Sequence, residues 1–357
     1  HVSDIYTDSR GFVWVCTWYG VSRFDGYTFK NFSTSPGDYS PLAHHRFLSV
    51  SEDSNGHLWF TTYNLHVYRL NRYTEQFEDV VALVPEADAK HGRVHFAKHD
   101  AEGGTYLALD DVGVVRLVGS DDERPVRVDA VYGQEMLGGE ASAAHIDTQG
   151  NAWIATAQGT LNYIPTSDRS RSCIVSRLAA PVFAFAETEH WVWGAASCGV
   201  VKASKANGHA VELPGDGADI TAIAADSVSR TVYAGTRTGG LYRLSEERMR
   251  RLTPRGPQPG RIRELAADSH GILWITTPEA GIMRYDPAKG DYKQFRHEPY
   301  TVTYNFDTIT KIAEGAGRLW VKMNKYGFGY YDREHDRIEP FCNDPKRLDC
   351  RMTNVAV

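Results

Sequence analysis

A pattern anchored on an aromatic residue occurs eight times along this chain. An acidic residue stands six positions before seven of the anchors, and a glycine stands three positions before six of them. Another glycine follows six or seven positions after every anchor but the second. The anchors, 40 to 47 residues apart, are Trp14, Trp59, Tyr106, Trp153, Trp193, Tyr233, Trp274 and Trp320. A four-point pattern repeated eight times predicts a repeat architecture in which every copy has the same fold.

One copy is predicted to form four short strands. In the first copy, residues 2–5, 12–17, 21–24 and 28–32 are rich in β-branched and aromatic residues. The turn Asp8-Ser-Arg-Gly11 separates the first two runs, with glycine free to take positive φ and aspartate able to accept from nearby N–H groups. Asp25-Gly26 forms a second turn. No copy shows helical spacing of apolar residues beyond one or two turns, so we predict an all-β chain.

A single four-stranded unit cannot bury both of its faces, so the copies must stack. Four strands per copy and this period are typical of a radial arrangement rather than of a linear solenoid. We therefore predict a β-propeller of four-stranded antiparallel blades, seven or eight in number. The anchor should lie on the second strand and pack between neighbouring blades. The WD40 signature is missing, and the kelch repeat is longer.

The charge and hydropathy patterns exclude several classes of protein. The formal charge is −6, from 39 basic and 45 acidic residues, and no basic run is present. We therefore predict no nucleic-acid partner. No apolar run reaches the length of a membrane span, so no direct membrane contact is expected. Both ends of the sequence fall within strand-like runs, which suggests a piece of a longer protein.

Five cysteines are too few for a disulfide scaffold. Cys342 and Cys350 are close enough in sequence to pair, and Cys173 with Cys198, in neighbouring copies, is a second candidate pair. Cys16 falls within a strand and is expected to be a small buried hydrophobe. Since five free thiols are the simplest alternative, the cysteines do not identify a cellular compartment.

The motifs of the first and seventh copies resemble the two-component-regulator propeller repeat. The first reads Asp8-x-x-Gly-Phe-Val-Trp14, then Thr17-x-x-Gly20-Val-x-Arg-Phe-Asp-Gly26-Tyr-x-Phe29. The seventh reads Asp268-x-x-Gly-Ile-Leu-Trp-Ile-Thr-Thr277, then Gly281-Ile-Met-Arg-Tyr-Asp286. The chain is similar over essentially its whole length to the N-terminal periplasmic sensor propeller of a Bacteroides-type hybrid two-component system.

This resemblance implies a periplasmic, ligand-sensing domain of a sensor histidine kinase and response regulator. It implies an oligosaccharide ligand from glycan breakdown and control of polysaccharide-utilisation genes. It also implies a downstream propeller, an immunoglobulin-like module and a kinase in the same chain, with a homodimer left open. The domain itself is expected to be non-catalytic and to need no cofactor. The alternatives are a protein-interaction propeller of a cell-surface or secretion component and, less favoured, a propeller lyase or hydrolase.

The number of copies leaves two domain organisations open. The family usually carries consecutive seven-bladed propellers, whereas this chain has eight copies. Residues 1–357 form a single β-propeller domain in one interpretation. In the other, residues 1–300 form a seven-bladed propeller and residues 301–357 form the first blade of a second one.

Candidate ligand-binding residues lie where the copies differ. Turns between the second and third strands, and connections into the next copy, should share one edge of the blades, where many loops converge. This edge is aromatic and cationic with some amides, which suits sugar faces and acidic or sulfated groups. Trp18 is the strongest candidate, because a second tryptophan beside Trp14 has no role in the blade. The candidates are Trp18, Tyr19, His45, Arg46, Tyr63, Arg237, Arg263, Asn305, Lys325 and Tyr326.

No catalytic constellation stands out from the repeat, since the acids recur as turn residues. His91, His95 and His99 are four residues apart and would need a helix to face one metal ion. Their stretch is predicted to be loop and then strand. We therefore predict no catalytic residue and no metal site. In the third copy, we expect the charged stretch 121–125 to be the fourth strand.

Overall fold

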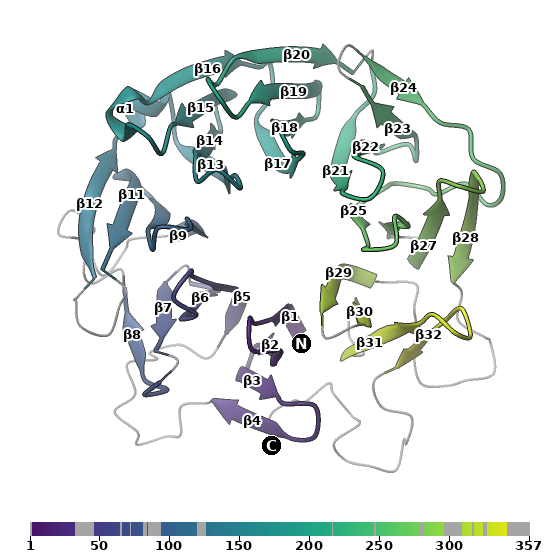
Figure 1. Cartoon of the computed structure of the whole chain (residues 1–357), viewed down its shortest axis with the longest axis horizontal. Helices are drawn as coiled ribbons and strands as arrows, with labels where there is room; N and C mark the ends of the chain where they lie inside the picture. Colours follow the sequence, from purple (N-terminus) through teal and green to yellow (C-terminus); the bar gives the residue numbers. More distant parts are fainter. Residues whose placement is uncertain are drawn as a thin grey trace. The chain divides into compact units, whose positions relative to one another are not determined.

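The chain folds as a β-propeller of eight blades, each a four-stranded antiparallel sheet, in this computed structural model (Figure 1). The strands fall into two compact units, mainly Val2–Val182 and Phe183–Val355, which we call the N-terminal and C-terminal units. Eight blades match the eight sequence copies. The structure describes residues 2–32, 46–64, 66–71, 73–80, 84, 94–119, 126–215, 217–245, 248–278, 281–295, 309–315, 318–323 and 327–340.

The N-terminal unit holds blades one to four, with strands in chain order within each sheet. Blades one and two comprise β1 (Val2–Thr7), β2 (Val13–Thr17), β3 (Gly20–Phe24), β4 (Phe29–Phe32), β5 (Phe47–Glu52), β6 (Leu58–Thr62), β7 (Val67–Leu70) and β8 (Phe77–Asp79). Blades three and four comprise β9 (Val94–His99), β10 (Thr105–Leu109), β11 (Gly113–Val118), β12 (Arg127–Tyr132), β13 (Ala141–Ile146), β14 (Ala152–Thr156), β15 (Thr160–Ile164) and β16 (Cys173–Arg177). The one-turn helix α1 (Gln134–Leu137) follows β12, and the 3₁₀ turn η2 (Arg169–Arg171) precedes β16.

The C-terminal unit holds blades five to eight, and its first strand begins at the boundary between the units. Blades five and six comprise β17 (Val182–Glu187), β18 (Trp191–Ala196), β19 (Gly199–Ser204), β20 (Ala210–Pro214), β21 (Ile220–Asp226), β22 (Thr231–Thr236), β23 (Leu241–Leu244) and β24 (Met249–Arg251). Blades seven and eight comprise β25 (Glu264–Ala267), β26 (Leu273–Thr277), β27 (Gly281–Asp286), β28 (Asp291–Phe295), β29 (Ile309–Gly315), β30 (Arg318–Met323), β31 (Gly327–Asp332) and β32 (Arg337–Pro340).

Two expectations from the sequence need correction. The fourth strand of blade three is β12, residues 127–132, and not the charged stretch 121–125, which lies outside the described residues. β12 alternates exposed and partly buried side chains, as an outer strand with one face in solvent does. Cys173 and Cys198 are exposed free thiols, so that pairing is wrong. Cys16 is buried as predicted, whereas Cys342 and Cys350 lie outside the described residues.

Among the described residues, an aspartate turn accepts a hydrogen bond from the anchor tryptophan in blades one, two, four and seven. In blade one, Asp8 accepts from the Nε1–H of Trp14 at 2.8 Å and from the backbone N–H groups of Arg10 and Phe12 at 3.0 and 2.9 Å. The anchors of blades two, four and seven donate in the same way to Asp53, Asp147 and Asp268.

The position three residues before the anchor adopts positive φ in blades one, two, three, four, six and seven, but not in blade five, where it is His190. Gly11 adopts φ 85°, and Arg230, which replaces glycine in blade six, is held at φ 53°. Since side chains other than glycine seldom adopt this conformation, the glycines of the repeat are explained by the turn.

The hydrophobic core lies between neighbouring blades of each unit. Trp14 of blade one packs with Phe47 and Phe60 of blade two, and Trp274 of blade seven packs with Ile312 of blade eight. All six anchor tryptophans are buried, as predicted. Burial of the rings between sheets explains why a single blade could not fold alone.

The two ends of a blade have different roles. We call the end with the turn between the second and third strands the top edge, and the opposite end, with the aspartate turn, the bottom edge. Near the top edge, the first strand carries a one-residue bulge in blades one, two, three, four, six and eight among the described strands. In blade one, the bulged Ser3 donates to the carbonyl of Phe47, and in blade six Thr221 donates to that of Ile262 at 2.5 Å. The bulge thereby joins the first strands of neighbouring blades.

At the bottom edge, the pair of blades one and two uses the same contacts as the pair of blades seven and eight. Ser9 donates through N–H and Oγ–H to Glu52 at 2.7 and 2.6 Å, and Ser269 donates to Glu314 at 2.8 Å through both groups. The same contact therefore holds two separate interfaces.

A carboxylate in the turn between the third and fourth strands forms a second recurring bridge. Arg23 of blade one lies 2.9 Å from Glu75 of blade two, and Arg284 of blade seven lies 3.0 Å from Asp336 of blade eight. Both carboxylate residues adopt positive φ, 54° and 49°. Burial tends to raise the pKa of Asp336, but the hydrogen bonds from Lys293 and Tyr331 and the positive charges of Lys293 and Arg284 together lower the pKa below its ordinary value. The bridge therefore favours a backbone conformation that is unfavourable by itself.

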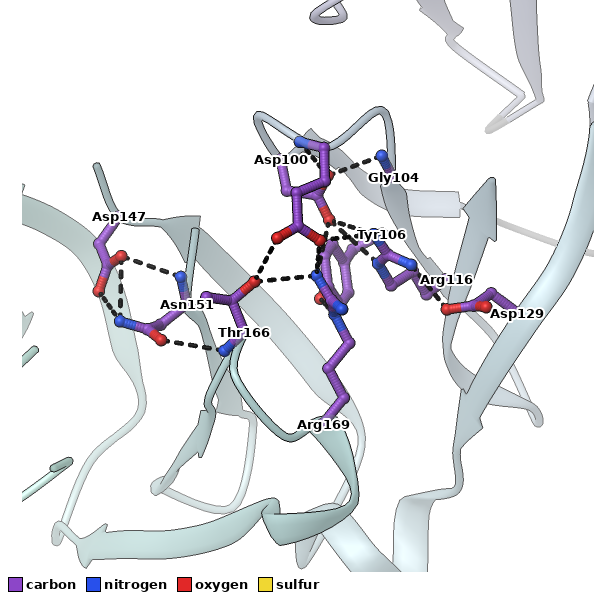
Figure 2. A network of polar contacts seen from close by, with 10 residues as sticks. Asp100, Gly104, Tyr106, Arg116, Asp129, Asp147, Asn151, Thr166 and Arg169 are labelled. Carbon is purple, nitrogen blue, oxygen red and sulfur yellow. Dashed lines mark hydrogen bonds and ion pairs between the residues drawn. The ribbon is translucent and has the colours of Figure 1, made fainter. Parts of the chain in front are cut away.

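Blade three replaces the anchor tryptophan with Tyr106 and supplies another donor to its aspartate (Figure 2). Arg116, which lies opposite Tyr106 on β11, donates through Nε and Nη2 to Asp100 at 3.0 and 2.7 Å. A side chain at Gly104 would place its Cβ 2.3 Å from Arg116 Nη2, so glycine leaves room for the guanidinium. The arginine thus replaces the hydrogen-bond donor that the missing indole would supply. We call Tyr106, Arg116 and Gly104 the compensating set.

Removing the guanidinium should destabilise blade three strongly. In Arg116→Ala, the fully buried carboxylate of Asp100 loses its hydrogen-bonded cation and keeps, among the described residues, only Arg169 at 3.8 Å, and we expect a loss of about 3 kcal/mol in the free energy of unfolding. The control is Arg171→Ala, which removes an exposed ion pair with Asp168 and should cost much less stability. Urea denaturation measures both, and equal losses would contradict the assigned role of Arg116.

The stability should also fall in mild acid because of His99. Its ring nitrogens bond the hydroxyls of Ser51 and Thr105 at 2.8 and 2.9 Å between blades two and three. Burial, assisted by Lys98 and opposed by Asp53, lowers the pKa of His99 from 6.5 to about 4. Between these values the unfolded chain binds a proton that the folded chain does not, so stability decreases as the pH falls from 6.5 towards 4.

The test compares unfolding free energies at pH 7.5 and pH 5. We expect His99→Gln, which retains hydrogen-bonding groups, to reduce the loss of stability at the lower pH. His190→Gln alters an exposed histidine and should leave the loss as in the unchanged protein. If His99→Gln loses as much stability as the unchanged chain, another group is responsible.

Candidate functional site

Two exposed aromatic residues follow β2 at the top edge of blade one. Thr17 forms the turn, since its Oγ1–H donates to the carbonyl of Gly20 at 2.9 Å and its oxygen accepts from Tyr19 N–H at 3.0 Å. The turn leaves Trp18 and Tyr19 38% and 56% exposed. Threonine performs the same task in blade six, where Thr236 accepts from Gly240 N–H at 2.8 Å. The repeat therefore fixes the turn and leaves the residues within it variable.

Arg46, which directly precedes β5 of blade two, contacts Trp18 of blade one. Its guanidinium carbon lies 5.0 Å from the ring centroid of Trp18, within the range of a cation–π contact. Its carbonyl accepts from the N–H of Tyr63 at 2.8 Å, which ties it to the turn after β6. Tyr63 is 61% exposed. We call Trp18, Tyr19, Arg46 and Tyr63 the aromatic–arginine cluster.

The chemistry of this cluster favours a ligand with both apolar faces and oxygen acceptors. The rings offer flat surfaces on which a sugar face can stack, and the phenol groups can hydrogen-bond hydroxyls. The guanidinium offers several N–H donors in one plane, which match a carboxylate or sulfate. None of the four side chains carries a negative charge.

The C-terminal unit carries two further candidates on adjacent segments. Arg237 follows β22 and pairs through Nε with Asp219, and its own N–H donates to the carbonyl of Asp219 at 2.8 Å. Ile262 N–H donates to the carbonyl of Thr236 at 3.1 Å, so the segment carrying Arg263 lies beside that turn. Arg263 is exposed. The charge of Arg237 is balanced by Asp219, which leaves Arg263 the more open cation of the two.

The remaining candidates cannot be placed. His45, Asn305, Lys325 and Tyr326 lie outside the described residues, and their roles stay predictions. Of the six described candidates, Trp18 and Arg46 are in contact, Tyr19 and Tyr63 lie on the turns beside them, and Arg237 and Arg263 belong to the other unit.

Sequence reasoning missed a second group at the top edge of the N-terminal unit. His95, Asp110 and Glu140 present one nitrogen and two carboxylate oxygens that lie within 4.8 Å of one another. His95 was considered only with His91 and His99. Its partners come from a turn and from the next blade, and neither the repeat nor helical spacing could have identified them.

The comparison with family models supports the repeat type. A model described as a two-component-regulator propeller matches residues 41–64, which confirms the resemblance within the second copy. No curated protein matches the chain. Among the described residues, no helix has the length and apolar character that a membrane crossing needs.

Similar solved structures support the fold. Virginiamycin B lyase from Staphylococcus aureus has 12% identity and a TM-score of 0.54, with 92% of this chain and 94% of that chain covered. The computationally designed protein Ika8 has 14% identity and a TM-score of 0.61, with 82% and 85% covered. The extracellular domain of a putative one-component system from B. thetaiotaomicron has 16% identity and a TM-score of 0.48, with 95% and 52% covered, so this chain spans about half of it. At these identities the likeness to the first two structures shows the fold alone.

The cation–π contact can be tested without a ligand. In Arg46→Ala, one face of the Trp18 ring loses its cover, so collisional quenching of tryptophan fluorescence by acrylamide should increase. The added quenching should vanish in a Trp18→Phe background, because the anchor tryptophans are buried. Arg237→Ala, in the other unit, serves as the control. Unchanged quenching in Arg46→Ala would show that the guanidinium does not cover the ring.

Proposed function

We propose that this chain is the ligand-sensing, extracytoplasmic propeller of a hybrid two-component sensor and that it binds an oligosaccharide from glycan breakdown. The motifs of the first and seventh copies and the family-model match over residues 41–64 support this proposal. The domain would lie in the periplasm, ahead of a second propeller, an immunoglobulin-like module and a histidine kinase. Ligand binding would favour one packing arrangement of these domains and so control polysaccharide-utilisation genes.

The observation that carries the proposal is the guanidinium of Arg46 over the exposed ring of Trp18. Tyr19 and Tyr63 extend this surface with further exposed rings. A sugar ring could stack on the aromatic faces while its oxygens accept from Arg46. Because the cluster has a cation and no carboxylate, we propose that it prefers an acidic or sulfated oligosaccharide over a neutral one.

We further propose that the domain is non-catalytic. The acids that recur in the repeat are engaged at the bottom edge, where Asp8 and Asp53 accept from backbone N–H groups and from the anchor indoles. Their role is thus accounted for by the turn. Turnover of any oligosaccharide by the purified domain would contradict this part of the proposal.

Isothermal titration with a panel of neutral, uronic-acid and sulfated oligosaccharides tests ligand binding. We expect a saturable complex with an acidic member of the panel and about 10-fold weaker binding by Trp18→Ala, equivalent to about 1.4 kcal/mol. The control is Tyr27→Ala, which removes a 95% exposed ring from the bottom edge of the same blade. It should bind as the unchanged protein does.

Two results would count against the proposal. Absence of binding across the panel would favour the alternative of a protein-interaction propeller. Equal weakening by Trp18→Ala and Tyr27→Ala would show that the ligand does not occupy the top edge.

A further inference from the structure

We propose that the top edge of blades three and four binds a first-row divalent transition-metal ion through His95, Asp110 and Glu140. The site is separate from the aromatic–arginine cluster, and it does not depend on the proposed oligosaccharide ligand.

The donor atoms already lie close together. His95 Nε2 is 2.5 Å from Asp110 Oδ1 and 3.5 Å from Glu140 Oε1. All three donor atoms lie within 4.8 Å of one another. A metal ion about 2.0–2.2 Å from each atom would hold neighbouring donors about 3–3.5 Å apart. The ion therefore requires a small separation of His95 from Asp110 and places the oxygens of Asp110 and Glu140 about 3–3.5 Å apart, adjustments that partly exposed side chains can make.

Three different segments supply the donors. His95 lies on β9, Asp110 follows β10 in the turn before β11, and Glu140 lies directly before β13 in the next blade. Each segment ends at the top edge, so the site combines a strand of one blade with the connection into its neighbour. An ion there would link blades three and four.

The backbone around Glu140 is held in place independently of any ion. Its N–H donates to Oε1 of Gln158 at 2.9 Å, and its carbonyl accepts from the N–H of Ala157 at 2.8 Å. Gly139 makes this possible, because a Cβ at that position would lie 1.9 Å from Gln158 Oε1. The Glu140 side chain is 47% exposed, so an ion can reach it from solvent. The backbone that carries this carboxylate is thus positioned by the fold, and the carboxylate itself remains accessible.

The donor types determine the class of ion. Ca²⁺ and Mg²⁺ prefer sites made of oxygen alone, whereas imidazole with carboxylates suits Zn²⁺ and Mn²⁺. With neutral His95, two carboxylates give the site a charge of −2, which a divalent cation balances. Three protein donors leave at least one coordination position for water or for an oxygen of a ligand.

Titration of metal-free protein with ZnCl₂, followed by calorimetry, tests the site. We expect one saturable site per chain that is weakened at least about 10-fold in His95→Ala and in Glu140→Gln. His190→Ala is the matched control, since His190 is an exposed histidine 4.0 Å from the carboxylate of Glu189 in the other unit. It should leave the site unchanged, and CaCl₂ should not compete with Zn²⁺.

A second measurement identifies the donors. Bound Co²⁺ should give a visible absorption spectrum that changes in Glu140→Gln, a substitution at an exposed position that preserves the shape of the side chain. Zinc binding that is equal in the unchanged protein, His95→Ala and Glu140→Gln would overturn the proposal. So would the absence of saturable binding, or tight Ca²⁺ binding that His95→Ala does not affect. None of these results bears on oligosaccharide binding.

Discussion

The blades depend on the hydrogen bonds that the buried carboxylate of the aspartate turn accepts. In blade one, a single side chain, Asp8, accepts from two backbone N–H groups of its turn and from the indole of Trp14. An unpaired carboxylate in this position would be costly to bury, so the turn and the anchor require each other. The contact fixes the bottom edge of the first two strands and places the ring between blades. The top edge is therefore free to vary, and the candidate ligand residues lie there.

The regular part of the fold could be predicted because each local requirement appears in the sequence. Glycine marks the positive φ of the turn, and alternation marks the strands, so the four strands of blade one lie within two residues of their predicted bounds. Blade three was less predictable. Its aspartate is satisfied by Arg116, and only the register of β10 with β11 shows that this arginine faces Tyr106. Its fourth strand was misplaced because a charged stretch precedes it.

The candidate sites were predictable as an edge of the blades but not as clusters. The repeat predicts from sequence that Trp18 and Tyr19 lie in the turn between the second and third strands, and the structure shows both exposed there. The contact between Trp18 and Arg46 depends on the path of a connection that has no periodicity. The same holds for His95 and Glu140, which come from different blades. Residues that meet through irregular connections leave no spacing signal, whereas residues that meet through strand register do.

The compensating set of blade three also limits how its sequence can change. A tryptophan restored at position 106 would compete with Arg116 for one oxygen of Asp100, and any larger residue at 104 would displace the guanidinium. Arginine stands opposite the anchor in other blades too, as Arg23 and Arg284 show. A blade with a tryptophan anchor could therefore acquire this arrangement in two steps. A glycine at the position of Gly104 would come first and make room for the guanidinium, and the replacement of tryptophan by tyrosine would follow. The effect of each substitution thus depends on which of the others is already present. The packing around Asp100 therefore constrains the order of substitutions as well as their identity.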